Sequence, residues 1–191
     1  MTTGTPISRR TFAALFGSPL FSASLGATDF WSALRSSGHF ALIRHALAPG
    51  TLDPPGFRLD DCATQRNLSA EGRAQAARMG DLFRSNGITS ARLYSSMWCR
   101  CLDTATLLKL GEVTPQPLLN FFGIDRAQRR PQLEALRAWI ATLDLSQPTL
   151  LMTHGEVISA LNQTSTDSGE IVAMERQTDG QLIVRGRQPT A

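Results

Sequence analysis

Lysine is almost absent from this 191-residue chain, which contains Lys109 as its single lysine and 18 arginines. A general polycation normally uses both basic residues, so the imbalance argues against one. The chain has three cysteines, too few for a disulfide-dense mini-protein. With 42% hydrophobic and 18% charged residues, the composition also excludes a disordered tail or a collagen-like repeat. The length suits one compact domain that builds its core without disulfides or metal.

The N-terminal segment has the features of an export signal. The basic pair Arg9-Arg10 is followed by Phe12 and by an uncharged stretch that continues to Ala27. This arrangement resembles a twin-arginine signal, which a receptor reads as an address. Glycine, proline and serine interrupt the apolar run, so it is too weak and too short to span a membrane. We therefore expect an export signal over residues 1–27 and a periplasmic location.

Cleavage after Ala27, with Ala23 as the alternative site, leaves a functional domain over residues 28–191. That domain carries 17 basic and 16 acidic residues and is nearly neutral. Nucleic-acid binding needs a clustered basic face, so we expect no nucleic-acid partner. We also expect no stable membrane insertion, and nothing in the sequence predicts an oligomeric state.

Segments typical of strands and helices alternate along this domain. Brief apolar runs predict buried strands over residues 39–44, 91–94 and 149–153. Capping residues and helical spacing predict helices over residues 30–37, 69–85, 97–110, 132–143 and 155–161. We expect a long functional loop over 46–67, an extended segment over 115–120 and two late strands over 170–175 and 181–185. The alternation indicates an α/β fold with a mostly parallel sheet.

Basic and nucleophilic side chains follow each of the three buried strands. Arg44-His45 follows the first strand, Arg100 lies shortly after the second, and His154 follows the third. Open α/β sheets place ligands at the carboxyl ends of their strands, so these side chains are expected to share one pocket. Guanidinium groups bind phosphoryl oxygens in bidentate fashion, and a neutral imidazole attacks phosphorus. His39, at the opposite end of its strand, receives no role.

The motifs around these residues resemble those of the histidine phosphatase superfamily. The matching segments are Leu42-Ile43-Arg44-His45-Ala46, Arg66-Asn67-Leu68-Ser69-Ala70-Glu71-Gly72-Arg73-Ala74-Gln75-Ala76, Tyr94-Ser95-Ser96 with Arg100, Thr104 and Ala105, and Leu150-Leu151-Met152-Thr153-His154-Gly155 with Ile158. They occur in the expected order and span about residues 40–161.

The resemblance implies a phosphoglycerate mutase-like fold, a three-layer α/β/α sandwich. It also implies a phosphohistidine intermediate on His45, with Arg44, Arg100 and His154 holding the phosphate and stabilising the transition state. Nearby arginine charges favour the neutral, nucleophilic form of His45 and stabilise the transferring phosphoryl group. We expect no cofactor and no metal, because arginine and histidine supply the positive charge.

The general acid departs from the family pattern. Mutase-like members place a glutamate after a Leu-Asn pair, but here Leu119-Asn120 is followed by Phe121. Other members have aspartate directly after the second histidine, where this chain has Gly155-Glu156. The candidate replacements are Asp61, Asp60, Glu156 and Asp125. We favour Asp61, because its loop follows the nucleophile and is expected to overhang the pocket.

The three cysteines, Cys62, Cys99 and Cys101, indicate one disulfide and one free thiol in an oxidising compartment. Cys99 and Cys101 flank Arg100, and Cys62 lies in the loop expected to cover it. A bridge from Cys62 to Cys99, or alternatively to Cys101, would fix that loop to the Arg100 segment. A zinc site is the competing interpretation, but the chain has no C-x-x-C pair.

These features together favour an exported phosphomonoesterase of the histidine acid phosphatase type. Its expected substrate is a small phosphorylated molecule or an envelope phosphosugar, such as a lipopolysaccharide core phosphate. Without a general acid, leaving groups that need little protonation are favoured, as in a phosphohistidine phosphatase. A non-catalytic phospho-ligand binding protein is the second alternative. A mutase is disfavoured, because free sugar phosphates are not expected outside the cytoplasm.

Overall fold

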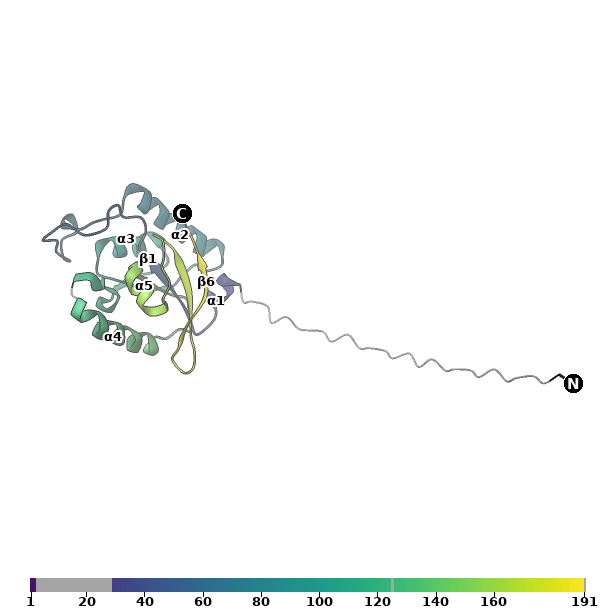
Figure 1. Cartoon of the computed structure of the whole chain (residues 1–191). Coiled ribbons are helices and arrows are strands. Elements are labelled where there is room, and N and C mark those ends of the chain that lie inside the picture. The colour runs from purple at the N-terminus through teal and green to yellow at the C-terminus, as the bar shows by residue number, and fades with distance from the viewer. Residues whose placement is uncertain (3–28, 125, 191) are drawn as a thin grey trace.

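The computed structural model describes residues 1–2, 29–124 and 126–190, so the predicted export signal lies outside the described residues from residue 3 onward. Six strands of the described chain form one sheet (Figure 1): β1 (His39–Arg44), β2 (Arg92–Ser95), β3 (Val113–Pro115), β4 (Thr149–Thr153), β5 (Ile171–Arg176) and β6 (Leu182–Gln188). The α-helices are α1 (Phe30–Arg35), α2 (Ala70–Ser85), α3 (Cys99–Leu108), α4 (Arg129–Thr142) and α5 (Gly155–Asn162).

The sheet has the order β3-β2-β4-β1-β5-β6 and is mostly parallel. Strands β3, β2, β4 and β1 pair in parallel, and β5 and β6 continue the sheet as antiparallel neighbours. Parallel neighbours need helical crossovers, and the chain supplies them between these strands. As a result, the carboxyl ends of β2, β4 and β1 lie side by side at one edge of the sheet.

Helices cover both faces of the sheet, which gives three layers. Ile43 of β1 and Met152 of β4 belong to a core with Met79 and Phe83 of α2. Their neighbour Leu42 faces the other way and belongs to a second core, which includes residues of α4 and α5. This alternation is the two-residue period of a strand that is buried on both faces. The predicted three-layer α/β/α sandwich is therefore the observed architecture.

The segment after β3 differs from its prediction. Instead of continuing extended to residue 120, the chain turns into a short 3-10 helix over Pro117–Leu119. Pro117 occupies the first turn, where a missing N–H costs nothing, and the Gln116 side chain accepts a hydrogen bond from the Leu118 N–H at 3.1 Å. This turn brings Asn120 and Phe121 to the carboxyl edge of the sheet.

Among residues 1–2, 29–124 and 126–190, no helix combines the length and apolar character that a membrane span requires.

Candidate active site

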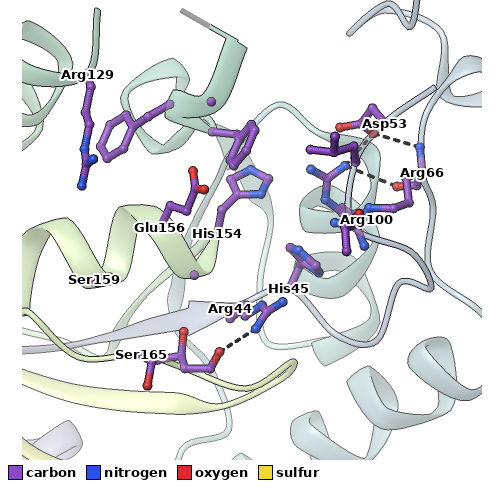
Figure 2. Close-up of a pocket in the computed structure, with 17 residues that line it drawn as sticks. Arg44, His45, Asp53, Arg66, Arg100, Arg129, His154, Glu156, Ser159 and Ser165 are labelled. Carbon is purple, nitrogen blue, oxygen red and sulfur yellow. Dashed lines mark hydrogen bonds and ion pairs between the residues drawn. The ribbon is translucent and has the colours of Figure 1, made fainter. Parts of the chain in front are cut away.

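A cavity of about 1020 Å³ opens at the carboxyl edge of β1 and β4. Two backbone hydrogen bonds continue the pairing of the strands to the base of this cavity. The His45 N–H donates to the Thr153 carbonyl at 3.0 Å, and the Ser96 N–H donates to the Met152 carbonyl at 2.9 Å. The four residues predicted from strand ends all line it: Arg44, His45, Arg100 and His154. Figure 2 shows these side chains converging from β1, α3 and the start of α5.

His45 is held as a neutral imidazole with one free ring nitrogen. Its Nδ1 lies 2.8 Å from the Ala46 carbonyl, which only accepts, so Nδ1 carries the proton. The Nε2 atom therefore keeps its lone pair. Burial and the charges of Arg100, Arg66 and Arg44 together lower the pKa of His45 to about 3, although the hydrogen bond to the Ala46 carbonyl acts in the opposite direction. His45 is thus in the form that can act as a nucleophile.

The motif that starts at Arg66 positions the backbone directly after His45. The Leu47 N–H donates to Gln75 Oε1 of α2 at 2.9 Å, and its carbonyl accepts from the Ser69 N–H at 3.1 Å. A Cβ atom added to Gly72 would lie 2.0 Å from the Leu47 carbonyl oxygen, so only glycine permits this approach. The hydroxyl of Thr104 on α3 accepts from the Ala46 N–H at 3.0 Å. Much of this motif therefore positions the backbone that carries the nucleophile.

Three arginines surround His45, and each has a buried nitrogen without a partner. The Nε atoms of Arg44, Arg66 and Arg100 are buried and unbonded, as is the hydroxyl of Thr166. All four residues line the cavity, and they account for four of the five such atoms in the described part of the chain. Buried donors without partners are costly, and clustered donors of this kind are satisfied when an anion enters. The cavity is therefore built for an oxyanion.

Asp53 and Arg66 complete this cluster, and sequence reasoning assigned a site role to neither. Asp53 Oδ1 accepts from Arg100 Nη1 and from the Arg66 N–H, each at 2.9 Å, and Oδ2 accepts from Trp98 Nε1 at 3.0 Å. Burial raises the pKa of Asp53, but the Arg66 N–H, the Arg100 charge and the Trp98 N–H outweigh it and lower the pKa below its usual value. Asp53 is thus a fixed carboxylate that orients Arg100. For Arg66, the available sequence signal was its place in the segment over residues 66–76 that resembles the superfamily.

His154 lies against His45, with ring centroids 5.5 Å apart. Its Nε2 is 2.8 Å from Ser96 Oγ, and that hydroxyl is 3.2 Å from Asn120 Oδ1, so the two residues fix the ring orientation. Burial first, then the electrostatic interactions with His45 and with the arginines, hold the pKa of His154 well below its usual value. Phe121 packs on the ring at a centroid distance of 5.6 Å. His154 thus lies beside His45 and the three arginines around it, where it is suited to bind a phosphate oxygen.

Comparison with known proteins matches residues 40–120 to the model of the histidine phosphatase superfamily (branch 1). Residues 40–120 thus match the histidine phosphatase superfamily. The matched segment contains four residues of the cavity: Arg44, His45, Arg66 and Arg100. No curated protein matches the chain in sequence at a significant level.

Solved structures of phosphatases and of a phosphoglycerate mutase share the fold. A candidate phosphohistidine phosphatase, SixA from Agrobacterium tumefaciens, is 18% identical with a TM-score of 0.58, covering 81% of this chain and 99% of its own. A mycobacterial glucosyl-3-phosphoglycerate phosphatase, solved with VO3, is 14% identical with a TM-score of 0.57, covering 78% and 97%. A phosphoglycerate mutase from Plasmodium falciparum is 18% identical with a TM-score of 0.52, covering 79% and 90%. The fold is therefore phosphoglycerate mutase-like.

A disulfide joins the long loop to the helix that carries Arg100. The bond links Cys62 and Cys99, whose Cα atoms are 5.7 Å apart, and Cys101 remains a buried free thiol. Burial raises the pKa of Cys101 to about 12, so the thiol stays protonated beside His154. Within the described residues, no three His, Cys, Asp or Glu side chains are grouped to hold a metal ion.

The carboxylates proposed as general acid are distributed differently from the expectation. Asp61 does not line the cavity, because its carboxylate pairs with Arg58 at 2.5 Å and accepts from the Ala63 N–H at 3.1 Å. Asp60 is exposed outside the cavity, and Asp125 lies outside the described residues. Glu156, two positions after His154, does line the cavity (Figure 2), and no hydrogen bond or ion pair with any described residue engages its carboxylate. The structure thus brings Glu156, and not Asp61, to the site.

Proposed function

We propose that this protein is a phosphatase that hydrolyses a phosphate monoester through a phosphohistidine on His45. The observation that carries the proposal is the set of unpartnered Nε atoms of Arg44, Arg66 and Arg100 around the free Nε2 of a neutral His45. Three guanidinium groups supply the positive charge that phosphoryl transfer requires.

In the first step, His45 Nε2 attacks the phosphorus atom and forms a P–N bond as the P–O bond to the leaving group breaks. The arginine cluster and His154 bind the phosphoryl oxygens and stabilise their charge in the transition state. Asp53 keeps Arg100 in place through the 2.9 Å ion pair between their side chains. The hydrogen bond from Nδ1 to the Ala46 carbonyl stabilises the positive charge that develops on the imidazole ring.

We assign the proton transfers to Glu156. A protonated Glu156 carboxyl donates its proton to the departing oxygen, so the leaving group departs as a neutral alcohol. In the second step, a water molecule attacks phosphorus and the P–N bond breaks. The Glu156 carboxylate takes the proton of that water, which returns the enzyme to its starting state with release of phosphate.

The assignment of Glu156 predicts a loss that depends on the leaving group. For Glu156→Gln, turnover of an alkyl ester such as glycerol 3-phosphate is expected to fall about 10²–10⁴-fold, the usual contribution of general acid catalysis. The kcat/KM for 4-nitrophenyl phosphate, which reports the steps up to departure of the leaving group and not the later attack of water, is expected to fall much less, because this leaving group departs without a proton. Steady-state kinetics on both esters measure the difference.

Asp61→Asn is the matched control, because Asp61 carries the same charge but lies outside the cavity. Its two rates are expected to stay close to those of the unsubstituted protein. A leaving-group-dependent loss in Asp61→Asn, with none in Glu156→Gln, would return the role of general acid to the long loop.

For location and substrate we propose a periplasmic enzyme that acts on envelope phosphosugars. The Arg9-Arg10 pair supports export through the twin-arginine route, and the Cys62–Cys99 bond suits an oxidising compartment.

Replacing Arg9-Arg10 by Lys-Lys is expected to retain the protein in the cytoplasm. Periplasmic material is expected to show one alkylatable thiol, that of Cys101, by mass spectrometry. Unchanged export, or three alkylatable thiols, would contradict this proposal.

A phosphohistidine phosphatase is the second candidate, favoured by the shared fold of the candidate SixA protein from Agrobacterium tumefaciens. The imidazole that leaves a phosphohistidine when its P–N bond breaks needs a smaller contribution from an acid than the alcohol of an alkyl ester does. A phosphate-release screen over phosphosugars, phosphoproteins and small esters separates these candidates. Tight binding of vanadate with no turnover of any ester would instead identify a phospho-ligand binding protein.

A further inference from the structure

We propose that Ser96 and Asn120 hold His154 in the tautomer whose Nδ1 atom carries no proton, so that the cavity binds a phosphoryl group together with one added proton. The inference rests on the proposed phosphatase function, because the proton is taken up where the ester binds. Ser96 and Asn120 act as positioning residues, and the singly protonated ester is the form of the substrate in the complex.

The backbone fixes the orientation of the Asn120 side-chain amide. The Met97 N–H donates to Asn120 Oδ1 at 2.8 Å. Because an N–H group only donates, this atom is the amide oxygen and not the amide nitrogen. Ser96 Oγ lies 3.2 Å from the same oxygen. An amide oxygen has no proton to offer, so the Ser96 hydroxyl donates its own proton to Asn120.

The direction of the Ser96 hydroxyl determines which nitrogen of His154 carries the proton. A serine hydroxyl has a single proton, and that proton points at Asn120. The contact of 2.8 Å between Ser96 Oγ and His154 Nε2 is therefore a hydrogen bond that Nε2–H donates. The Cys101 thiol, which stays protonated, donates to the Thr153 carbonyl at 3.6 Å, so its sulfur also only accepts from Nε2. A neutral ring with its proton on Nε2 has a lone pair on Nδ1.

This lone pair of His154 faces the cavity. No hydrogen bond with any described residue engages Nδ1, and Nδ1 is not one of the unpartnered atoms that the fold buries completely. His154 is only 3% exposed and lines the cavity, so the open side of Nδ1 is the cavity itself. The two histidines thus present different nitrogens to the substrate. His45 carries its proton on Nδ1 and has an open Nε2, whereas His154 carries its proton on Nε2 and has an open Nδ1.

A lone pair at this position requires a proton when phosphate binds. The oxygens of a dianionic phosphoryl group only accept, so an oxygen placed against Nδ1 is repelled. One proton between the two atoms converts the contact into a charge-assisted hydrogen bond. Burial and the electrostatic interactions with His45 and the arginines keep the pKa of His154 low, so this proton is absent before binding. It arrives from solvent or on the ester, whose second pKa is about 6, and it leaves with the released phosphate.

Other groups that change charge near the cavity need to be separated from His154. The titratable or charged residues around this position are Arg44 and His45 of β1, Asp53 and Arg66 of the long loop, Arg100 and Cys101 of α3, Arg129 of α4, and Glu156 of α5. The arginines stay charged and the Cys101 thiol stays protonated near pH 7. His45 stays neutral down to about pH 3, and the lowered pKa of Asp53 keeps it a carboxylate. Glu156 is the other member of this set that can take up a proton.

Nitrogen-15 NMR of the histidine rings reads the tautomers directly. The chain has three histidines, so the spectrum contains three sets of ring signals. Near neutral pH the free protein is expected to show His154 protonated on Nε2 and His45 protonated on Nδ1. Inorganic phosphate is expected to move the His154 Nδ1 signal toward its protonated position. A proton on Nδ1 of His154 in the free protein, or an unchanged signal in the complex, would overturn the inference.

Titration calorimetry with inorganic phosphate counts the protons. Buffers with different heats of ionisation give the number taken up, and about one proton per phosphate is expected at about pH 8.5, where phosphate is a dianion. Ser96→Ala removes the acceptor of the Nε2 proton, which lets the ring carry that proton on Nδ1. Its proton uptake is expected to fall toward zero while phosphate still binds. Ser159→Ala is the matched control, because Ser159 lines the cavity without a hydrogen bond to His154, and it is expected to keep the uptake.

Glu156→Gln separates the two groups that can take up the proton, and it is expected to keep the uptake. Loss of the uptake in Glu156→Gln, with none in Ser96→Ala, would place the proton on Glu156 and overturn the inference. Phosphate binding without proton uptake, or no phosphate binding at any pH, would overturn it as well. If Ser96→Ala does not fold, the tautomers of the unsubstituted protein decide the question.

Turnover of 4-nitrophenyl phosphate distinguishes this inference from the proposed function. If the ester is hydrolysed but phosphate binds without a proton, the assigned tautomer is wrong and the phosphatase stands. If the tautomer and the proton uptake are found but no ester is hydrolysed, the phosphatase is wrong and the proton-coupled binding of phosphate stands.

Discussion

Replacing His45 by alanine is expected to reduce kcat/KM for 4-nitrophenyl phosphate by at least about 10⁴-fold, the scale seen when a covalent nucleophile is removed. The pocket loses its only route to a P–N intermediate, while the arginine cluster still binds phosphate. Rapid quenching of the unsubstituted protein is expected to trap a phosphoenzyme that is stable to alkali and labile to acid. The alanine variant is expected to form none.

His39→Ala is the matched control, because His39 lies at the opposite end of the same strand, outside the cavity, with its Nδ1 on the Ser37 carbonyl. It is expected to keep the phosphoenzyme and most of the turnover. Equal rates for His45→Ala and the unsubstituted protein, or a phosphoenzyme in both, would remove His45 from the mechanism.

The depressed pKa of His45 adds a pH dependence to this prediction. An ordinary histidine loses its nucleophilic form below about pH 6.5, but His45 stays neutral down to about pH 3. The acid limb of kcat/KM is therefore expected to lie well below pH 6.5, unless another group sets it. The stability of the fold does depend on pH in this range. Between about pH 6.5 and 3 the unfolded chain binds a proton at His45 and the native state does not. Stability is thus expected to fall with decreasing pH, which denaturant titrations at pH 7 and pH 5 measure.

Replacing Arg100 by alanine is expected to lower both activity and stability. The guanidinium group binds the transferring phosphoryl oxygens, and loss of such an arginine costs about 10³–10⁵-fold in kcat. The substitution also leaves the buried Asp53 carboxylate without its ion-pair partner at 2.9 Å. Breaking a buried ion pair from one side destabilises the fold by about 3–5 kcal/mol. Kinetics and denaturant unfolding measure the two effects separately.

The double variant Arg100→Ala/Asp53→Asn separates catalysis from folding. Neutralising Asp53 removes the uncompensated buried charge, so part of the lost stability is expected to return. Activity is expected to remain low, because no guanidinium group replaces Arg100. Recovery of activity together with stability would mean that Arg100 acts by holding the fold, and that another group stabilises the phosphoryl transfer.

Most of the fold follows from local sequence signals. The apolar run at His39–Arg44 became β1 with the predicted bounds, and Ser69 accepts from the Gly72 N–H at 3.0 Å as the cap of α2. The turn over Pro117–Leu119 was not predicted, because residues distant in the sequence stabilise it in place of an extended strand. Gln132 Nε2 donates to the Asn120 carbonyl at 2.8 Å, and Thr153 Oγ1 donates to the Leu119 carbonyl at 2.6 Å.

The acid and the anion partners could not be assigned in the same way. Asp61 was favoured for its place in the loop, but a neighbouring arginine and a local N–H turn its carboxylate away from the cavity. Asp53 belongs to the same loop and reaches Arg100 across 47 residues of sequence. Two aspartates in one loop look alike in sequence, because the direction of a side chain in an irregular loop depends on contacts that folding creates.

The sequence by itself determined that a few arginines and histidines follow neighbouring parallel strands, and strand order then brings Arg44, His45, Arg100 and His154 together. The scarcity of lysine carried little information compared with that placement. Only the tertiary structure decided which of two similar residues, one or two positions apart, has a given partner or lines the cavity. Cys99 bonds to Cys62 while Cys101 faces His154, and Arg129 lines the cavity while Arg130 meets Glu134. Each residue turns about 100° around a helix, so adjacent side chains meet different surroundings that only the packed fold defines.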